Sequence, residues 1–118
     1  MGNYPKAVGP YSPYIKSGNL LFCSGQIGIN PESGKLVEGS IDEETKQVIN
    51  NIKGVLSENG LDLTNVIKTI IFLDDMNNFT KVNEIYGEYF ITKPARSTVE
   101  VSKLPVGAKI EIEVIAAF

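Results

Sequence analysis

The 118-residue sequence contains no histidine, so the side chain that most often serves as a neutral-pH base and as a metal ligand is missing. Cys23 is the sole cysteine, which excludes an internal disulfide and fits a reducing compartment. No apolar run approaches the ~20 residues that a membrane-spanning helix needs, and no signal-peptide pattern opens the chain. We therefore expect a soluble, cytoplasmic protein with no membrane partner, in which Cys23 is a small buried core thiol rather than a nucleophile.

Metal and cofactor sites find no support in the remaining residues. Neither acidic cluster, residues 42–44 or residues 74–75, has the alternating spacing of a calcium loop, and each is explained by a helix start or a strand-end turn. Residues 25–28 (Gly-Gln-Ile-Gly) match neither a phosphate loop nor a dinucleotide fingerprint, and indicate a bend or bulge. We expect no metal and no cofactor.

Composition indicates one ordinary globular domain spanning residues 1–118, with 42% apolar and 21% charged residues. A net charge of −3 and the lack of a Lys/Arg run make nucleic acid an unlikely partner.

The periodicity of apolar residues predicts the helices and strands. Residues 14–16 and 20–24 form a hairpin, 66–73 a strand, and 94–101 and 109–114 two final strands; helices run from Ser40 to Asn59 and from Asn78 to Phe90. This order predicts an α+β domain with two helices packed on a mixed sheet.

Two residues of the final strands are candidates for chemistry. Arg96 can grip a carboxylate with its planar fork, and Glu111 can accept a proton; the short connection between their strands can bring them into one neighbourhood. Each also has a structural explanation. Arg96 can pair with a surface carboxylate such as Glu100 or Glu113, and Glu111 can be a solvated residue on the polar face of an alternating strand.

Blocks along nearly the whole chain resemble the Rid family, the reactive intermediate deaminases also called the YjgF or RidA group. These blocks are Gly9-Pro10-Tyr11-Ser12, Phe22-Cys23-Ser24-Gly25-Gln26-Ile27, Val37-Glu38-Gly39, Val66-Ile67-Lys68-Thr69, residues 72–79, residues 82–86, Pro94-Ala95-Arg96-Ser97-Thr98-Val99 and Ile110-Glu111-Ile112-Glu113. Matched blocks in the same order are far more specific than any single motif.

The resemblance implies a chorismate-mutase-like fold assembled as a homotrimer with clefts between subunits. It implies a 2-iminobutanoate/2-iminopropanoate deaminase that hydrolyses enamine/imine products of pyridoxal-phosphate dehydratases to 2-oxo acids and ammonia, without a cofactor. Carried over to this sequence, the carboxylate-binding arginine is Arg96 and the water-orienting glutamate is Glu111. The substrate-binding residues around them fall on Tyr11, Gly25, Asn83 and Thr98.

The sequence departs from the family pattern in two places. Many members carry cysteine where this chain has Thr98, whose backbone N–H is expected to keep its role, and residues 90–94 are short relative to many relatives. Two other functions remain open alternatives. One is a non-catalytic trimer that binds small carboxylates and regulates a partner; the other is a translation inhibitor or endoribonuclease, which the acidic balance and the absence of histidine disfavour.

Overall fold

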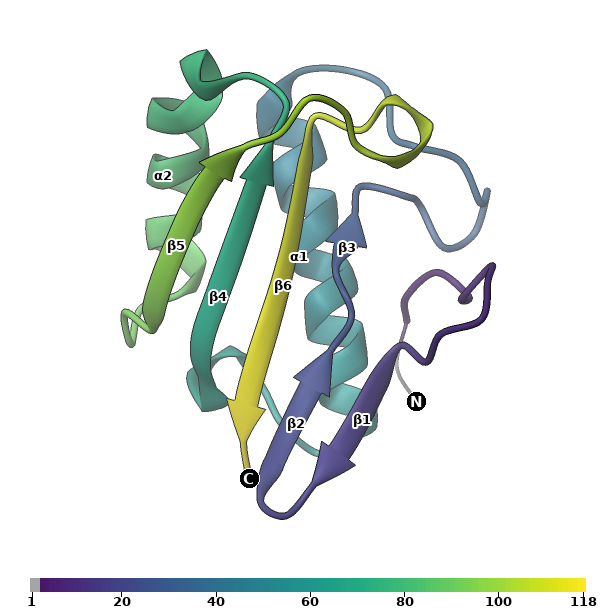
Figure 1. The fold of residues 1–118 in the computed structure, drawn as a ribbon, viewed down its shortest axis with the longest axis vertical. Helices are drawn as coiled ribbons and strands as arrows, with labels where there is room; N and C mark the ends of the chain where they lie inside the picture. Colours follow the sequence, from purple (N-terminus) through teal and green to yellow (C-terminus); the bar gives the residue numbers. More distant parts are fainter. Residues whose placement is uncertain (1–2) are drawn as a thin grey trace.

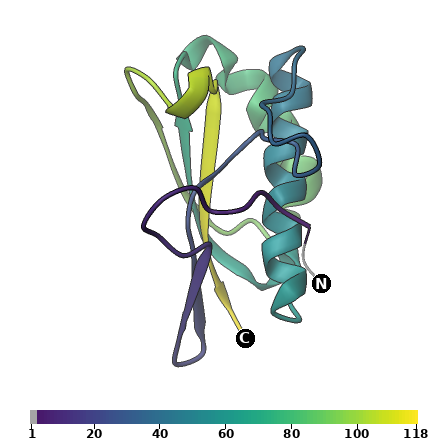
Figure 2. The same cartoon turned by 90° about the vertical axis from the view of Figure 1, so that its right-hand side faces the viewer.

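The structure is a computed structural model that describes residues 3–118, in which one six-stranded sheet carries two helices (Figure 1). The elements run in the order β1 (Tyr14–Ser17), β2 (Leu20–Cys23), β3 (Gln26–Ile27), α1 (Ile41–Glu58), β4 (Val66–Leu73), α2 (Phe79–Tyr89), β5 (Ala95–Glu100) and β6 (Ile110–Ala117). Seen from the side, the sheet and the helices form two layers (Figure 2). The predicted α+β arrangement is confirmed.

The strands lie in the order β1-β2-β6-β4-β5, with β3 also pairing with β6. All neighbouring strands are antiparallel except β4 and β5, which run parallel. A parallel pair needs a crossover, and α2 supplies it. As a result β5 is an edge strand and β6, the last element, lies at the centre of the sheet.

Helix α1 follows from its end signals and its apolar spacing. The hydroxyl of Ser40 accepts a hydrogen bond from the N–H of Glu43, and three acidic residues occupy the first turn, where the helix dipole favours negative charge. The chain leaves the helix through Asn59 and Gly60, whose φ of 72° suits glycine. Every residue of the expected apolar stripe is buried, namely Thr45, Val48, Ile49, Ile52, Val55 and Leu56.

The core lies between the helices and one face of the sheet. Along β6 the residues Ile110, Ile112 and Val114 face the helices and are almost fully buried, as the period-2 alternation predicts. Cys23 belongs to this core, and burial raises the pKa of its thiol to about 11. A thiol that stays protonated is a poor nucleophile, which agrees with its interpretation as a core residue.

Three features differ from the predicted elements. Residues 25–28, which were expected to form a bend or bulge, contain the two-residue strand β3. This strand pairs with β6 and is too short to show any periodicity. Helix α2 begins at Phe79, because the preceding residues Met76–Asn78 form a 3-10 turn. Strand β6 extends to Ala117, three residues beyond the expected end.

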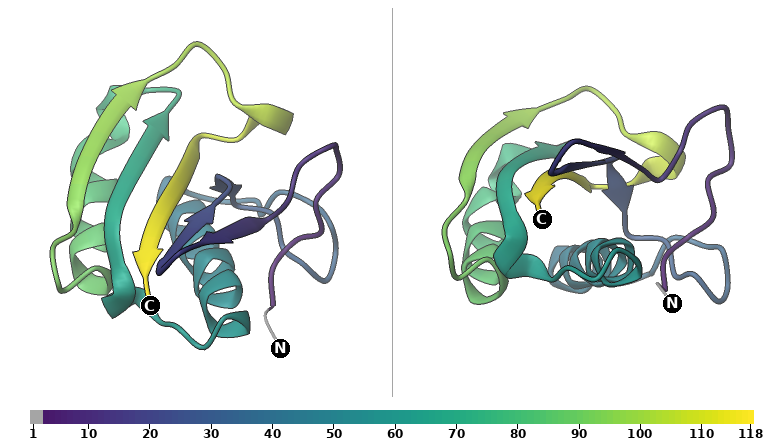
Figure 3. Two further views of the ribbon diagram at one scale, coloured as in Figure 1. Left: turned by 60° about the horizontal axis from the view of Figure 1, so that its bottom comes forward. Right: turned by 90° about the horizontal axis from the view of Figure 1, so that it is seen from below.

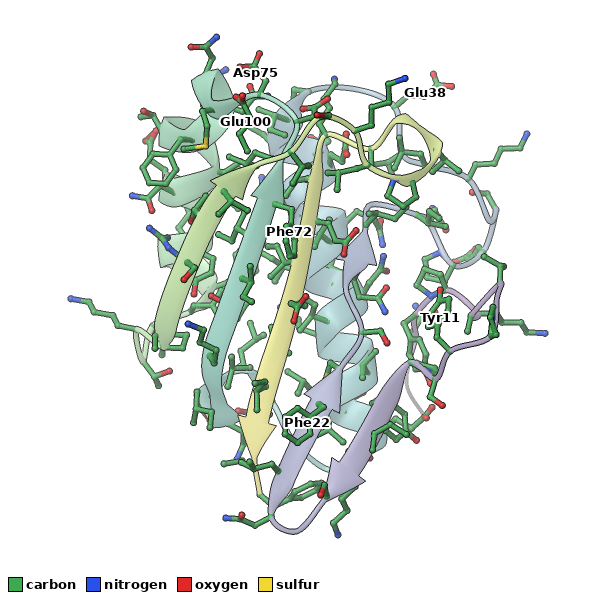
Figure 4. All side chains as sticks on the ribbon, viewed as in Figure 1. Tyr11, Phe22, Glu38, Phe72, Asp75 and Glu100 are labelled. Carbon is green, nitrogen blue, oxygen red and sulfur yellow. The ribbon has the colours of Figure 1, made fainter. Side chains whose placement is uncertain are left out.

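The face of the sheet opposite the helices is bare and largely apolar. In cross-strand register, Ile15 lies beside Phe22 and Phe22 beside Ile115, while Phe72 lies beside Val99. Ile15, Phe22 and Val99 are 56%, 42% and 43% exposed. Figure 4 shows Phe22 and Phe72 on the side turned away from the helices, and Figure 3 shows the sheet curling around α1, so that neither helix covers this face.

Candidate active site

Arg96 lies on β5 and faces the helix layer. Its guanidinium donates a hydrogen bond of 2.7 Å from Nη1 to Oδ1 of Asn83 on α2. The guanidinium carbon also lies 4.9 Å from the ring centre of Tyr86 and 5.7 Å from that of Phe79. These contacts orient the planar fork while leaving most of its five N–H donors free for a ligand.

The surface ion pair considered for Arg96 is not what the structure shows. Glu100 accepts instead from the backbone N–H of Met76, at 2.7 Å. Arg96 and Asn83 line a cavity of about 430 Å³, together with Tyr86, Gly87, Phe90, Ile91, Lys93 and Pro94. This cavity therefore combines a cation, an amide and aromatic rings, which suits a small planar anion.

Glu111 lies on β6 and faces the other side of the sheet. Its neighbours in register are Ile27 and Phe72. The side chain is half-buried, and its pKa is raised because burial disfavours the ionised form and, secondarily, because Glu113 carries like charge. A carboxylate with a raised pKa is a better proton acceptor near neutral pH than an ordinary surface glutamate.

Gly25 fits against Glu111. A Cβ on residue 25 would lie 2.1 Å from Oε2 of Glu111, so any other residue would displace the carboxylate or the backbone. The adjacent Ser24 fixes the incoming loop, since its N–H donates to the carbonyl of Pro13 and its hydroxyl to the carbonyl of Ser12, at 2.9 and 2.6 Å. Glycine at this position is therefore required by contact rather than by backbone conformation.

Tyr11, Gly25 and Glu111 share a second cavity, of about 560 Å³. Tyr11 is 52% exposed, and Figure 4 shows it on the loop before β1. The other lining residues are mostly apolar and come from the N-terminal segment, β3 and the turn before β6; they include Pro5, Val8, Ile27, Ile29, Pro105 and Val106. The carboxylate of Glu111 and the ring of Tyr11 thus lie among mostly apolar residues, with Lys6 and Glu32 as the other charged residues of the lining.

The expectation that Arg96 and Glu111 meet is wrong within a single chain. Arg96 is in register with Thr69 and Glu111 with Phe72, both on β4. Residues three apart on a strand point to opposite faces, so the two side chains lie on opposite sides of the sheet. They also line different cavities.

Thr98 lies two residues beyond Arg96 on the same face of β5, in register with Ile71. It lines neither of the two cavities, and its buried hydroxyl oxygen has no hydrogen-bond partner in the structure. An unpaired buried hydroxyl costs free energy, so Thr98 is a locally unfavourable feature of β5 next to the Arg96 cavity.

Within residues 3–118 no group of three His, Cys, Asp or Glu side chains is placed to hold a metal ion. In the same part of the chain, no helix combines the length and the apolar character needed to cross a membrane.

Tyr86 also belongs to this site, although the sequence analysis did not identify it as a site residue. Its hydroxyl lies 2.7 Å from that of Thr69, and its ring lies beneath the guanidinium of Arg96. Its spacing of three from Asn83 places both on one helical face, a signal that was available. No sequence pattern indicated that residues 3–8 line the cavity of Glu111.

Comparison with known proteins identifies the family. Residues 1–118 match the family model described as Endoribonuclease L-PSP. A RutC family protein of Pyrococcus horikoshii is 54% identical over 97% of this chain and 91% of its own length. A human protein named 2-iminobutanoate/2-iminopropanoate deaminase is 47% identical, covering 95% of this chain and 82% of the relative. A Yersinia pestis structure titled as a member of the conserved Rid protein family has a TM-score of 0.95 and 51% identity, covering 98% of this chain and 94% of that one.

The chain belongs to the Rid family. The resemblance seen in the sequence is thereby confirmed, and so is the fold that it implied. Five of the residues carried over from the family resemblance line the two cavities: Arg96 and Asn83 line one, and Tyr11, Gly25 and Glu111 line the other.

Proposed function

We propose that this Rid protein is an enamine/imine deaminase that hydrolyses 2-imino acids, such as 2-iminobutanoate and 2-iminopropanoate, to 2-oxo acids and ammonia. The proposal rests on one observation: the chain has two groups suited to this reaction, in separate cavities. One is the oriented guanidinium of Arg96, and the other is the carboxylate of Glu111, whose pKa is raised. A 2-imino acid needs both, because one group must hold its carboxylate and the other must activate water at its imine carbon.

We infer further that the two half-sites meet between copies of the chain in a homotrimer. The bare sheet face exposes contiguous apolar side chains, and such patches mark protein interfaces. A second copy is the occupant that fits best, since it would also supply the cavity that each chain lacks. The single buried Cys23 suits a reducing compartment, so we place this activity in the cytoplasm.

The reaction can be written with the residues present. Arg96, held by Asn83, grips the substrate carboxylate in a charge-assisted contact worth ~1.5–3 kcal/mol. The substrate reacts as the protonated iminium: Glu111 accepts a proton from water as the water oxygen bonds to the iminium carbon, giving a neutral carbinolamine. Glu111 returns that proton to nitrogen, then accepts the hydroxyl proton as the carbonyl forms and the C–N bond breaks, and the released ammonia takes up this proton and leaves as ammonium. Tyr11 lines the same cavity and can donate to the departing nitrogen.

The test is an assay in which threonine dehydratase generates the imine and semicarbazide traps whatever is not hydrolysed. Wild-type protein is expected to lower the trapped fraction, and Arg96→Ala and Glu111→Gln to abolish the effect. Glu113→Gln is the matched control when the assay is run on the pH plateau, because Glu113 lies on the same face of β6 and lines neither cavity, and its charge affects only the acid limb through the pKa of Glu111.

The alternatives are decided by the same assay. If wild type leaves the trapped fraction unchanged but binds 2-oxo acids, the chain is a small-carboxylate-binding regulatory protein. If it does neither and cleaves RNA in nuclease-free preparations, the activity named in its family model is the relevant one. Its net charge of −3 and lack of histidine weigh against that outcome.

A further inference from the structure

The N-terminal segment forms one wall of the cavity that contains Glu111. Residues 3–8 all line this cavity, together with Gly25, Ile27 and Glu111. Figure 2 shows the segment crossing from the helix layer to the sheet layer before it enters β1. Residues 3–8 belong to no helix or strand, so the position of this wall depends on the contacts that hold these residues to the rest of the molecule.

Two tyrosines attach this segment to the end of α1. The hydroxyls of Tyr4 and Tyr14 both donate to Oε2 of Glu58, at 2.9 and 2.8 Å. Burial and the bond to Glu58 raise the pKa of Tyr4 to about 12, so the donor stays protonated at physiological pH. Both ends of the loop that carries Tyr11 are thus tied to one carboxylate, which restricts the loop between them.

Gly54 provides a second attachment. A Cβ at this position would lie 2.1 Å from the carbonyl oxygen of Asn3, and its nearest other contacts are also backbone atoms of Asn3. Gly54 lies inside α1, where glycine costs about 0.5–1 kcal/mol relative to alanine. The helix itself therefore gains nothing from glycine here, whereas the close approach of the N-terminal segment requires it.

We propose that Gly54, Tyr4 and Glu58 are positioning residues that hold residues 3–8 as a fixed wall of the Glu111 cavity, and thereby restrict the site to 2-imino acids with small side chains. The inference rests on the proposed function. When the wall is fixed, its apolar members Pro5, Ala7 and Val8 can contact a methyl or ethyl group and leave less room for a benzyl group. A released wall gives up the first contact and admits the larger group.

Gly54→Ala and Glu58→Gln test this inference, with Tyr89→Phe as control. Alanine strengthens the helix while its Cβ displaces Asn3, so Gly54→Ala is expected to fold. Glu58→Gln keeps the size of the side chain but removes the charge that both tyrosines bond. Tyr89 also loses a hydroxyl in its control variant, and it lies on α2 outside both cavities.

Two measurements are made on each variant. Hydrogen exchange reports whether residues 3–13 are released. Steady-state assays with an L-amino acid oxidase compare the imine from phenylalanine with that from 2-aminobutyrate. We expect faster exchange in both test variants, and a kcat/KM ratio of large to small substrate that rises about tenfold, the low end of what apolar pocket contacts discriminate. The change should appear mainly in KM, with Tyr89→Phe unchanged.

Any other combination of exchange rates and substrate ratios contradicts either this inference or the proposed function on which it rests. Faster exchange with an unchanged ratio overturns the specificity role, and unchanged exchange overturns the attachment. If wild type hydrolyses no imine but binds 2-oxo acids, the proposed function fails, and the ratio of Kd values for phenylpyruvate and 2-oxobutanoate decides the inference instead. If wild type binds neither, both proposals fail together.

Discussion

The two cavities of this chain have nearly opposite chemistry. The Arg96 cavity, between α2 and β5, has a cation fixed by an amide and an aromatic ring. The Glu111 cavity, between the N-terminal segment and β3, has a carboxylate of raised pKa among apolar side chains. The first has an oriented guanidinium that can hold an anion, and the second has a carboxylate that can act as a base, with Lys6 as the cation on its lining.

This contrast teaches that the two groups of the proposed catalytic pair are divided between two cavities of the chain. The sheet separates them, because β4 lies between β5 and β6 and the two side chains project from opposite faces. The proposed function therefore places a second copy of the chain at each site. Each of the following changes alters one half-site and leaves the other intact.

Arg96→Lys should have the largest effect. Lysine keeps the charge but loses the planar fork and the stacking on Tyr86, so kcat/KM is expected to fall about 10- to 150-fold for a contact worth ~1.5–3 kcal/mol. Steady-state kinetics with 2-iminobutanoate measures this loss. Lys93→Asn is the control, since Lys93 lines the same cavity and its φ of 54° suits asparagine. A loss as large in Lys93→Asn would mean that the cavity needs net charge rather than the fork.

Mixing inactive subunits tests the division itself. Arg96→Ala and Glu111→Gln chains, each inactive alone, are unfolded and refolded together in equal amounts. If each site takes one half from each of two subunits, about a quarter of the sites draw an intact glutamate and an intact arginine. Activity should therefore return to about a quarter of wild type.

Refolding Arg96→Ala with the double variant Arg96→Ala/Glu111→Gln is the control for the mixing experiment, because that mixture contains no intact arginine. The absence of recovery in the first mixture, with mixed oligomers confirmed by mass, would place the whole site in one chain.

Gly25→Ala should damage the Glu111 half-site alone. The new Cβ displaces the carboxylate, so we expect kcat to fall about tenfold, as for a misplaced general base, with the affinity for a 2-oxo acid nearly kept. Gly28→Ala is the matched control: its Cβ would press on Cγ of Glu44, at 2.8 Å, and should lower the melting temperature without a selective loss of kcat. Equal kcat losses in both would trace the effect to β3 as a whole.

Glu113→Gln should give the smallest and most specific change. Glu111 must be ionised to accept a proton, so activity falls as the pH drops through its raised pKa. Burial causes most of that rise and Glu113 adds to it, so removing the charge of Glu113 lowers the pKa of Glu111. The acid limb of the kcat profile should move to lower pH while the plateau is kept. A limb that does not move would assign the titration to another group.

The fold was largely predictable because its signals are local. The apolar stripe and Ser40 cap of α1 and the alternation of β6 each require only neighbouring residues. Strand β5 shows the limit. Its apolar residues Ala95 and Val99 are exposed, while Arg96 turns toward the helices, the reverse of the usual alternation. The register of β5 with β4 and the position of α2 determine which face of the sheet Arg96 lies on, and both depend on contacts between residues far apart in the sequence.

The candidate site was less predictable for the same reason. Family resemblance placed Arg96, Asn83 and Glu111, but no local pattern shows that two of them share one face and the third lies across the sheet. The attachment of Tyr4 to Glu58 joins residues 54 positions apart and is invisible to any window of sequence.

If the bare face of the sheet is the interface of the proposed trimer, the stability of the protein depends on its own abundance. In the proposed trimer, dissociation returns Phe22, Val99 and their neighbours to water, so by mass action a higher chain concentration favours the folded, assembled form. Dilution then acts as a mild denaturant. The amount of this chain that a cell makes becomes one of the terms that keep it folded.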